Sequence, residues 1–165
     1  MKDKILVLDF GGQYDLLIAR RVREHRVYAE IKAYDKITVD EIASSGYSGI
    51  IFTGGPNSVC DASSPHFDPA VLSLGIPVLG ICYGHQLMAY MAGGTIAASG
   101  AGSEYGKTVV HTDRCALFEG IPSQSVCWMS HTDGVTCLPE GFKSVARSDK
   151  CACAAMCDES RGAPC

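Results

Sequence analysis

Short apolar runs alternate with helical patterns through the first half of the chain, and this alternation constrains the fold more than any other feature. The runs lie at residues 4–9, 27–34, 49–53 and 77–81, and the helical patterns lie at 14–25, 40–44, 68–74 and 84–91. Segments that alternate in this way pair their strands in parallel through right-handed crossovers. The sequence therefore predicts an α/β fold with an open, doubly wound, mostly parallel sheet and helices on both faces.

After about residue 95 the strand candidates become shorter and are separated by loops, which predicts smaller antiparallel additions. They lie at 95–98, 108–111, 126–129, 143–147 and 153–157. Earlier, one helical face is formed by Tyr14, Leu17, Ile18 and Val22, and Asp40 is expected to help start the next helix. We find no internal repeat and no linker, so a single domain over residues 1–165 is the simplest prediction.

The composition excludes several classes of protein. With 47% apolar and 19% charged residues, the chain can build a core and is not intrinsically disordered. Its net charge of -4 argues against a nucleic-acid surface, which needs a basic excess. No apolar run approaches the roughly 20 residues that span a bilayer, and no signal peptide is evident. We therefore expect a cytoplasmic protein with neither a nucleic-acid nor a membrane partner.

The nine cysteines are expected to be reduced and mostly buried, because an odd number cannot all pair within one chain. Cys151, Cys153 and Cys157 raise the question of a metal site. Their segment alternates like a strand, and it lacks the paired Cys-x-x-Cys spacing of structural zinc sites. The sequence thus predicts no metal site.

The sharpest chemical motif is Gly80-Ile81-Cys82-Tyr83-Gly84, in which a strand runs directly into a helix. This is the nucleophile-elbow pattern with cysteine in place of serine. A turn this tight needs residues without side chains at Gly80 and Gly84. The dipole of the following helix favours the thiolate of Cys82, and the backbone N–H of Tyr83 is well placed to donate to an oxyanion. The alternative is a buried cysteine at an ordinary glycine-rich turn.

Two further glycine loops follow strands and fall at the same edge of the predicted sheet, where doubly wound folds bind ligands. Gly54-Gly55-Pro56 is a source of a second oxyanion N–H, although such tripeptides more often mark simple turns. Gly11-Gly12 lacks both glycine-rich nucleotide-binding patterns, so we reject nucleotide binding there.

Taken in order, these loops resemble those of the class I (triad) glutamine amidotransferases, which have a flavodoxin-like fold, and most of all the glutaminase domain of GMP synthetase. The matching segments lie at residues 5–14, 49–59, 75–89, 104–106 and 128–133, so the likeness covers about residues 4–158. It implies that glutamine is the substrate and that the ammonia released serves amination of XMP to GMP. The partner would be an ATP-pyrophosphatase domain or subunit of the synthetase. That part is absent from this chain and would be where ATP and Mg act, so no cofactor is expected here.

The resemblance also implies a role for each matching residue. Cys82 would attack the side-chain amide of glutamine and form a thioester, and Gly55 and Tyr83 would supply the oxyanion N–H groups. The amino-acid end of the substrate would be bound by Gln86 together with three residues of a later loop, Ser130, His131 and Asp133.

The sequence departs from the family at the catalytic base. The family takes its base and orienting acid from a His-Pro-Glu segment, whereas no His-x-Glu occurs among these 165 residues. His131 is a better substitute base than His85, but we favour a hydrogen-bonded loop role for it. We therefore expect a truncated or frameshifted gene product, or a fragment, whose domain is incomplete at the C-terminus and has weak or no glutaminase activity when alone. Two alternatives remain: an inactive binding or regulatory module of the same family, and a Cys-elbow hydrolase or redox sensor.

Overall fold

The computed structural model describes residues 3–98 and 103–158. The chain divides into two compact units, Met1–Met88 and Ala89–Cys165, which we describe separately. The prediction that residues 1–165 form a single domain stays a prediction. None of the helices in the described ranges is long and apolar enough to cross a membrane.

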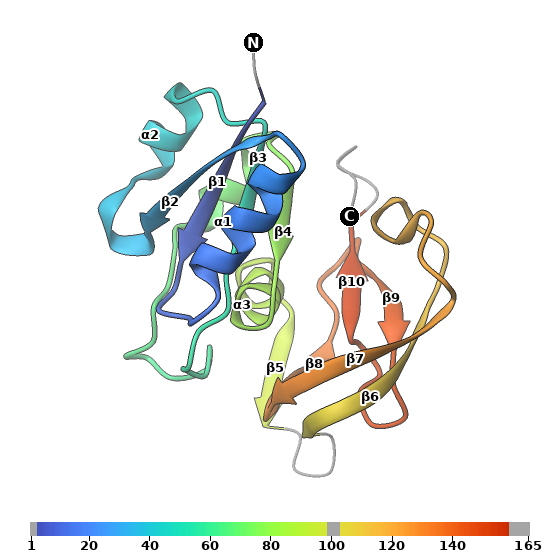
Figure 1. Cartoon of the computed structure of the whole chain (residues 1–165). Coiled ribbons are helices and arrows are strands. Elements are labelled where there is room, and N and C mark those ends of the chain that lie inside the picture. The colour runs from blue at the N-terminus through green and yellow to red at the C-terminus, as the bar shows by residue number, and fades with distance from the viewer. Residues whose placement is uncertain (1–2, 99–102, 159–165) are drawn as a thin grey trace. The chain divides into compact units, whose positions relative to one another are not determined.

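The first unit is built on a four-stranded, wholly parallel sheet with the order β2-β1-β3-β4. Its elements are β1 (Lys4–Asp9), α1 (Asp15–Glu24), β2 (Tyr28–Ala33), α2 (Val39–Ser44), β3 (Gly49–Phe52), β4 (Val78–Gly80) and α3 (Tyr83–Met91). The strand order reverses at β1, because β2 lies on one side of it and β3 on the other (Figure 1). Right-handed crossovers then place the connecting helices on opposite faces of the sheet. The predicted doubly wound architecture is confirmed.

The central strand β1 is apolar because it is covered on both faces. Leu6, Val7 and Leu8 are fully buried, as expected for a strand inside a parallel sheet. Val7 belongs to a cluster with Ala19 of α1 and Ala29 of β2.

Two local predictions about the helices were wrong, the first of them only in part. Of the four residues of the expected apolar face, Tyr14 and Leu17 are exposed, whereas Ile18 and Val22 pack beside the buried Ala19 as predicted. The apolar stripe is thus rotated relative to the expected face. Helix α2 begins after Thr38, not at Asp40, because the Thr38 side chain accepts from the Glu41 N–H while the Glu41 carboxylate accepts from the Thr38 N–H. This reciprocal capping box satisfies two N–H groups at once.

The second unit contains two antiparallel sheets, as the shorter strand candidates predicted. A four-stranded sheet has the order β10-β9-β6-β7, and a two-stranded sheet pairs β5 with β8 (Figure 1). The strands are β5 (Thr95–Ala98), β6 (Glu104–Thr112), β7 (Gln124–His131), β8 (Asp133–Cys137), β9 (Lys143–Arg147) and β10 (Ala155–Cys157). Strands β6 and β7 are about twice as long as predicted, and β8 was missed.

Three short 3-10 helices complete the described elements, at Tyr34–Lys36, Pro69–Ser73 and Ala116–Phe118. The middle one replaces the helix predicted at 68–74; Asp68 caps it by accepting from the Ala70 N–H at 2.9 Å.

The cysteines differ from the expectation of mostly buried, reduced thiols. Among the described residues, seven cysteines carry no disulfide, and four of these are exposed: Cys60, Cys82, Cys127 and Cys137. Cys157 is disulfide-bonded. The thiols are therefore largely surface groups rather than small core hydrophobes.

Candidate active site

Cys82 lies in the sharp connection between β4 and α3, which leaves only Ile81 and Cys82 outside the two elements. Its φ is 55° and its side chain is exposed. A left-handed backbone costs a residue with a side chain on the order of 1–3 kcal/mol, so it persists only where the surroundings impose it. Here the N–H groups of Ile81 and Gly84 donate to the carbonyls of Phe52 (3.0 Å) and Thr53 (3.1 Å).

The two glycines that flank Cys82 have no room for side chains. A Cβ at Gly80 would lie 2.6 Å from the backbone carbon of Gly84, and a Cβ at Gly84 would lie 2.6 Å from the Cβ of Phe52. Both distances are shorter than real Cβ contacts. The geometry agrees with the sequence argument that the turn requires glycine at these positions.

The three glycine loops meet at the carboxyl edge of the parallel sheet. A Cβ at Gly54 would lie 3.9 Å from the Cys82 Sγ, so the loop after β3 passes beside the thiol. The loop after β1 reaches the same place, since a Cβ at Gly12 would lie 2.9 Å from the Gly54 carbonyl carbon. This edge is the switch point of the strand order, where ligands of such sheets bind.

Tyr83 and Gly55 also lie together. A Cβ at Gly55 would lie 3.3 Å from the Cγ of Tyr83 and 2.9 Å from the Phe10 carbonyl oxygen. The Tyr83 ring is buried with its centroid 5.7 Å from that of Phe10, and its hydroxyl donates to the Pro65 carbonyl. Burial, with the nearby Tyr34, raises the pKa of the Tyr83 phenol to about 12, so it stays protonated. The side chain thus fixes the start of α3, where N–H groups lack intrahelical acceptors.

Thr53 positions two of the loops around Cys82, a role that the sequence analysis did not predict. It is fully buried, and its hydroxyl accepts from the Phe10 N–H at 3.1 Å and donates to the Gly54 carbonyl at 3.1 Å. One side chain therefore ties the loop after β1 to the loop after β3. The available signal was a hydroxyl residue at the end of an apolar strand, directly before two glycines.

Gln86 lies one helical turn beyond Cys82, and its N–H donates to the Cys82 carbonyl at 3.1 Å. Only 8% of the residue is exposed. His85, the weaker of the two histidines considered as a base, is half-buried on the same helix.

The other three predicted substrate residues belong to the second unit, where they do not form the expected loop. Ser130 and His131 end strand β7, and Asp133 begins β8 after a one-residue bend. Neighbours on a strand project to opposite faces, and accordingly Ser130 is exposed while the His131 side chain is 16% exposed. The His131 Nε2 lies 3.4 Å from the carboxylate of Glu104, which is buried, and its Nδ1 lies 3.1 Å from the Asp133 carbonyl oxygen.

Comparison with known proteins identifies the family. The model of the family "Glutamine amidotransferase class-I" matches residues 6–163, nearly the whole chain. The chain belongs to the class I glutamine amidotransferases. The three strand-end loops are therefore loops of an amidotransferase fold.

Curated relatives narrow the similarity further. The chain is 53% identical over 156 residues to "GMP synthase [glutamine-hydrolyzing]" of Clostridium botulinum (strain Alaska E43), covering 94% of this chain and 30% of that protein. It is also 53% identical over 161 residues to the protein of the same name from Clostridium acetobutylicum, covering 97% and 31%. The chain thus spans about 30% of the length of these relatives.

Solved structures agree with the fold. A putative GMP synthase subunit from Thermoplasma acidophilum superposes with a TM-score of 0.83 at 28% identity, covering 98% of this chain and 80% of that one. A glutamine amidotransferase from Thermotoga maritima gives a TM-score of 0.81 at 20% identity, covering 95% and 72%.

Proposed function

We propose that this chain is the glutaminase part of a GMP synthetase. It hydrolyses glutamine through a Cys82 thioester and supplies ammonia for the amination of XMP. The observation that carries the proposal is the exposed Cys82 thiol, held at a φ of 55° beside Gly54 at the carboxyl edge of the parallel sheet. The names of the two clostridial relatives support the choice of GMP synthetase within the family.

The proposed chemistry has two steps. The Cys82 sulfur attacks the carbon of the glutamine side-chain amide, the C–N bond breaks, and ammonia leaves with the thiol proton. Water then attacks the thioester carbon, which releases glutamate and restores the thiol. In both steps the N–H groups of Gly55 and Tyr83 stabilise the oxyanion, where a single donor is worth roughly 100- to 1,000-fold in rate. Gln86, Ser130, His131 and Asp133 bind the amino-acid end of glutamine.

The partner of this chain and the fate of the ammonia are proposed from the similarity to GMP synthases. Ammonia passes to a synthetase domain or subunit, which uses ATP and Mg to activate XMP, while this chain itself needs no cofactor for glutamine hydrolysis. The protein acts in the cytoplasm, without a nucleic-acid or membrane partner.

The test is covalent labelling of Cys82. A glutamine-analogue electrophile should modify Cys82, excess glutamine should prevent the modification, and Cys82→Ala should abolish it. Cys60→Ala is the matched control, because Cys60 is an exposed thiol of the same unit that carries no disulfide. Labelling of Cys60 and Cys82 at equal rates, without protection by glutamine, would remove the proposal and favour a Cys-elbow hydrolase or redox protein.

A second candidate function is a binding or regulatory module of the same family, which would apply to a protein that has no His-x-Glu base. General-base steps contribute roughly 100- to 10,000-fold, so a chain without the base would bind glutamine with little turnover and act as a binding or regulatory module. Weak or no ammonia release from the isolated chain is compatible with both functions, whereas rapid release is compatible only with the first. We expect weak or no release from this chain alone, and release at ordinary enzyme rates that Cys82→Ala abolishes would exclude the binding module.

A further inference from the structure

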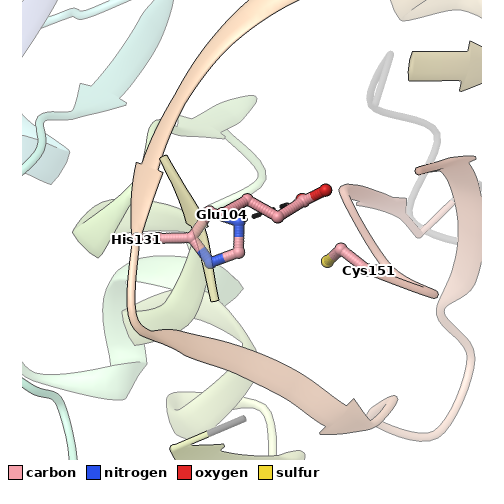
Figure 2. A group of neighbouring side chains, drawn as sticks. All are labelled: Glu104, His131 and Cys151. Carbon is pink, nitrogen blue, oxygen red and sulfur yellow. Dashed lines mark hydrogen bonds and ion pairs between the residues drawn. The ribbon is translucent and has the colours of Figure 1, made fainter. Parts of the chain in front are cut away.

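Glu104, His131 and Cys151 form a cluster in the second unit. Glu104 begins β6 and His131 ends β7, and the antiparallel register places the two residues directly opposite each other. Side chains at paired positions project to the same face. Cys151 lies in the segment between β9 and β10. The side chains point toward one another, and one ligand atom from each lies within 4.8 Å of the other two (Figure 2).

Neighbouring groups hold these side chains in place through hydrogen bonds. His131 Nδ1 lies 3.1 Å from the Asp133 carbonyl oxygen, so Nδ1 carries a proton that it donates to this oxygen. Nε2 faces Glu104, where a metal ion would take the place of a proton on this nitrogen. Metal-binding histidines characteristically donate their other N–H to such an acceptor.

Ser148 connects the other two members. Its hydroxyl donates to the Glu104 Oε1 at 2.6 Å and accepts from the Cys151 N–H at 2.9 Å. This leaves the second carboxylate oxygen, Oε2, on the side of the His131 Nε2, 3.4 Å away. The carboxylate and the cysteine backbone are therefore positioned by one hydroxyl.

The distances suit a tetrahedral ion after a small adjustment. Zinc bonds of about 2.0–2.3 Å to nitrogen, oxygen and sulfur put neighbouring ligand atoms roughly 3.3–3.7 Å apart. The separation of 3.4 Å between the His131 and Glu104 atoms already fits, and the 4.8 Å limit on the remaining separations leaves about 1 Å to close. Charge also fits, since a thiolate, a carboxylate and a neutral imidazole together balance a divalent cation.

We propose that Glu104, His131 and Cys151 bind Zn²⁺ or a similar borderline divalent cation, with a fourth position open to water. The spacing of the cysteines in the sequence predicted no metal site. The structure brings Cys151 together with residues 47 and 20 positions earlier in the chain instead of with Cys153 and Cys157. The site lies outside the proposed thioester chemistry, although it shares His131 with the proposed glutamine contacts.

The test is metal binding by the full 165-residue chain after treatment with a chelator. Competition with a chromophoric chelator should show one equivalent of tightly bound Zn²⁺. Co²⁺ alone should give a thiolate-to-cobalt charge-transfer band and the visible bands of a tetrahedral ion. Cys151→Ser should remove the charge-transfer band and weaken Zn²⁺ binding at least tenfold, and Ser148→Ala should weaken it roughly 10- to 100-fold.

Cys127→Ser is the matched control, because Cys127 is an exposed thiol of the same unit without a disulfide; its binding should equal that of the original chain. Circular dichroism checks the folding of each variant. If Cys151→Ser does not fold, Glu104→Gln replaces it, with the same loss of affinity expected. Absence of the charge-transfer band from the original chain, or its persistence in a folded Cys151→Ser variant, would overturn the proposal and leave a simple ion pair between Glu104 and His131.

Discussion

The two units position their reactive side chains in different ways. Around Cys82 the backbone does the positioning, through a left-handed residue, two glycines without room for side chains and a helix start. Around Glu104 side chains do it, through strand register and one bridging hydroxyl. A backbone-made site needs particular residues at fixed short spacings, whereas a register-made site needs only that distant strands pair correctly. The first leaves a pattern in the sequence and the second does not.

The largest expected effect tests the backbone-made site. Gly84→Ala should lower the free energy of unfolding by about 3 kcal/mol or more, because the new Cβ would lie 2.6 Å from the Phe52 Cβ. Denaturant unfolding followed by circular dichroism measures the loss.

The matched control is Gly46→Ala, at a φ of 68° with nothing within 4 Å of the new Cβ. This variant should lose only about 1 kcal/mol, the conformational cost alone. Equal losses in the two variants would mean that the tight packing at the elbow is not a requirement of the fold.

The second prediction concerns the buried hydroxyl that joins two loops of the first unit. Thr53→Val keeps the side-chain shape but leaves the Phe10 N–H without its acceptor, and Phe10 is 1% exposed. We expect a loss of about 1–3 kcal/mol. Thr136→Val, at an exposed threonine that donates to the Thr95 carbonyl, should cost much less. If Thr53→Val lowers the free energy of unfolding no more than this control does, the Thr53 hydroxyl does not hold the loops after β1 and β3 together.

The third prediction applies the same reasoning to the second unit. Glu104→Gln keeps the size of the side chain and removes the charge that faces Ser148 and His131. Hydrogen bonds to charged groups contribute more than neutral ones, so unfolding without added metal should become easier by about 1.5 kcal/mol. Glu140→Gln, at an exposed position, should change it by less than about 0.5 kcal/mol. An unchanged Glu104→Gln variant would show that register alone holds these side chains together.

The difference between a backbone-made site and a register-made site explains which features the sequence predicted and which it did not. The parallel sheet, its switch-point edge and the Gly80-x-Cys82-x-Gly84 turn were predicted because buried strands and tight turns restrict the residues that they accept. The pairing of Glu104 with His131 was not predicted, because register is set by a whole strand and both strands proved longer than their apolar cores. Thr38 was missed as a cap because Asp40, also a good cap residue, lies two positions away. The roles in glutamine hydrolysis stay predictions for all of the expected site residues: Cys82, Gly55, Tyr83, Gln86, Ser130, His131 and Asp133.

The fourth prediction uses the buried thiol of Cys153. Burial, helped by the nearby Cys151, raises the pKa of this thiol to about 11. A raised pKa makes the reactive thiolate a minor species at neutral pH, so alkylation should quicken about tenfold for each pH unit between 7 and 10. At pH 7.5, Cys153 should react at least about tenfold more slowly than the exposed Cys127. Peptide mass spectrometry after timed alkylation measures both; equal rates would place Cys153 at the surface.

The smallest expected effect is spectroscopic and concerns strand β7. Trp128, the one tryptophan of the chain, is 74% exposed, and the nearby Val126 is 67% exposed. The side chain of His131 on the same strand is only 16% exposed. Polarity therefore does not mark the buried face of this strand, which is a further reason why its register escaped prediction. The emission of Trp128 should resemble that of indole in water, should be quenched readily by acrylamide, and should shift little on unfolding. A blue-shifted emission that moves to the red on unfolding would mean that the face of β7 carrying Trp128 is buried. In that case the second unit, like the first, would bury its apolar side chains and expose its polar ones.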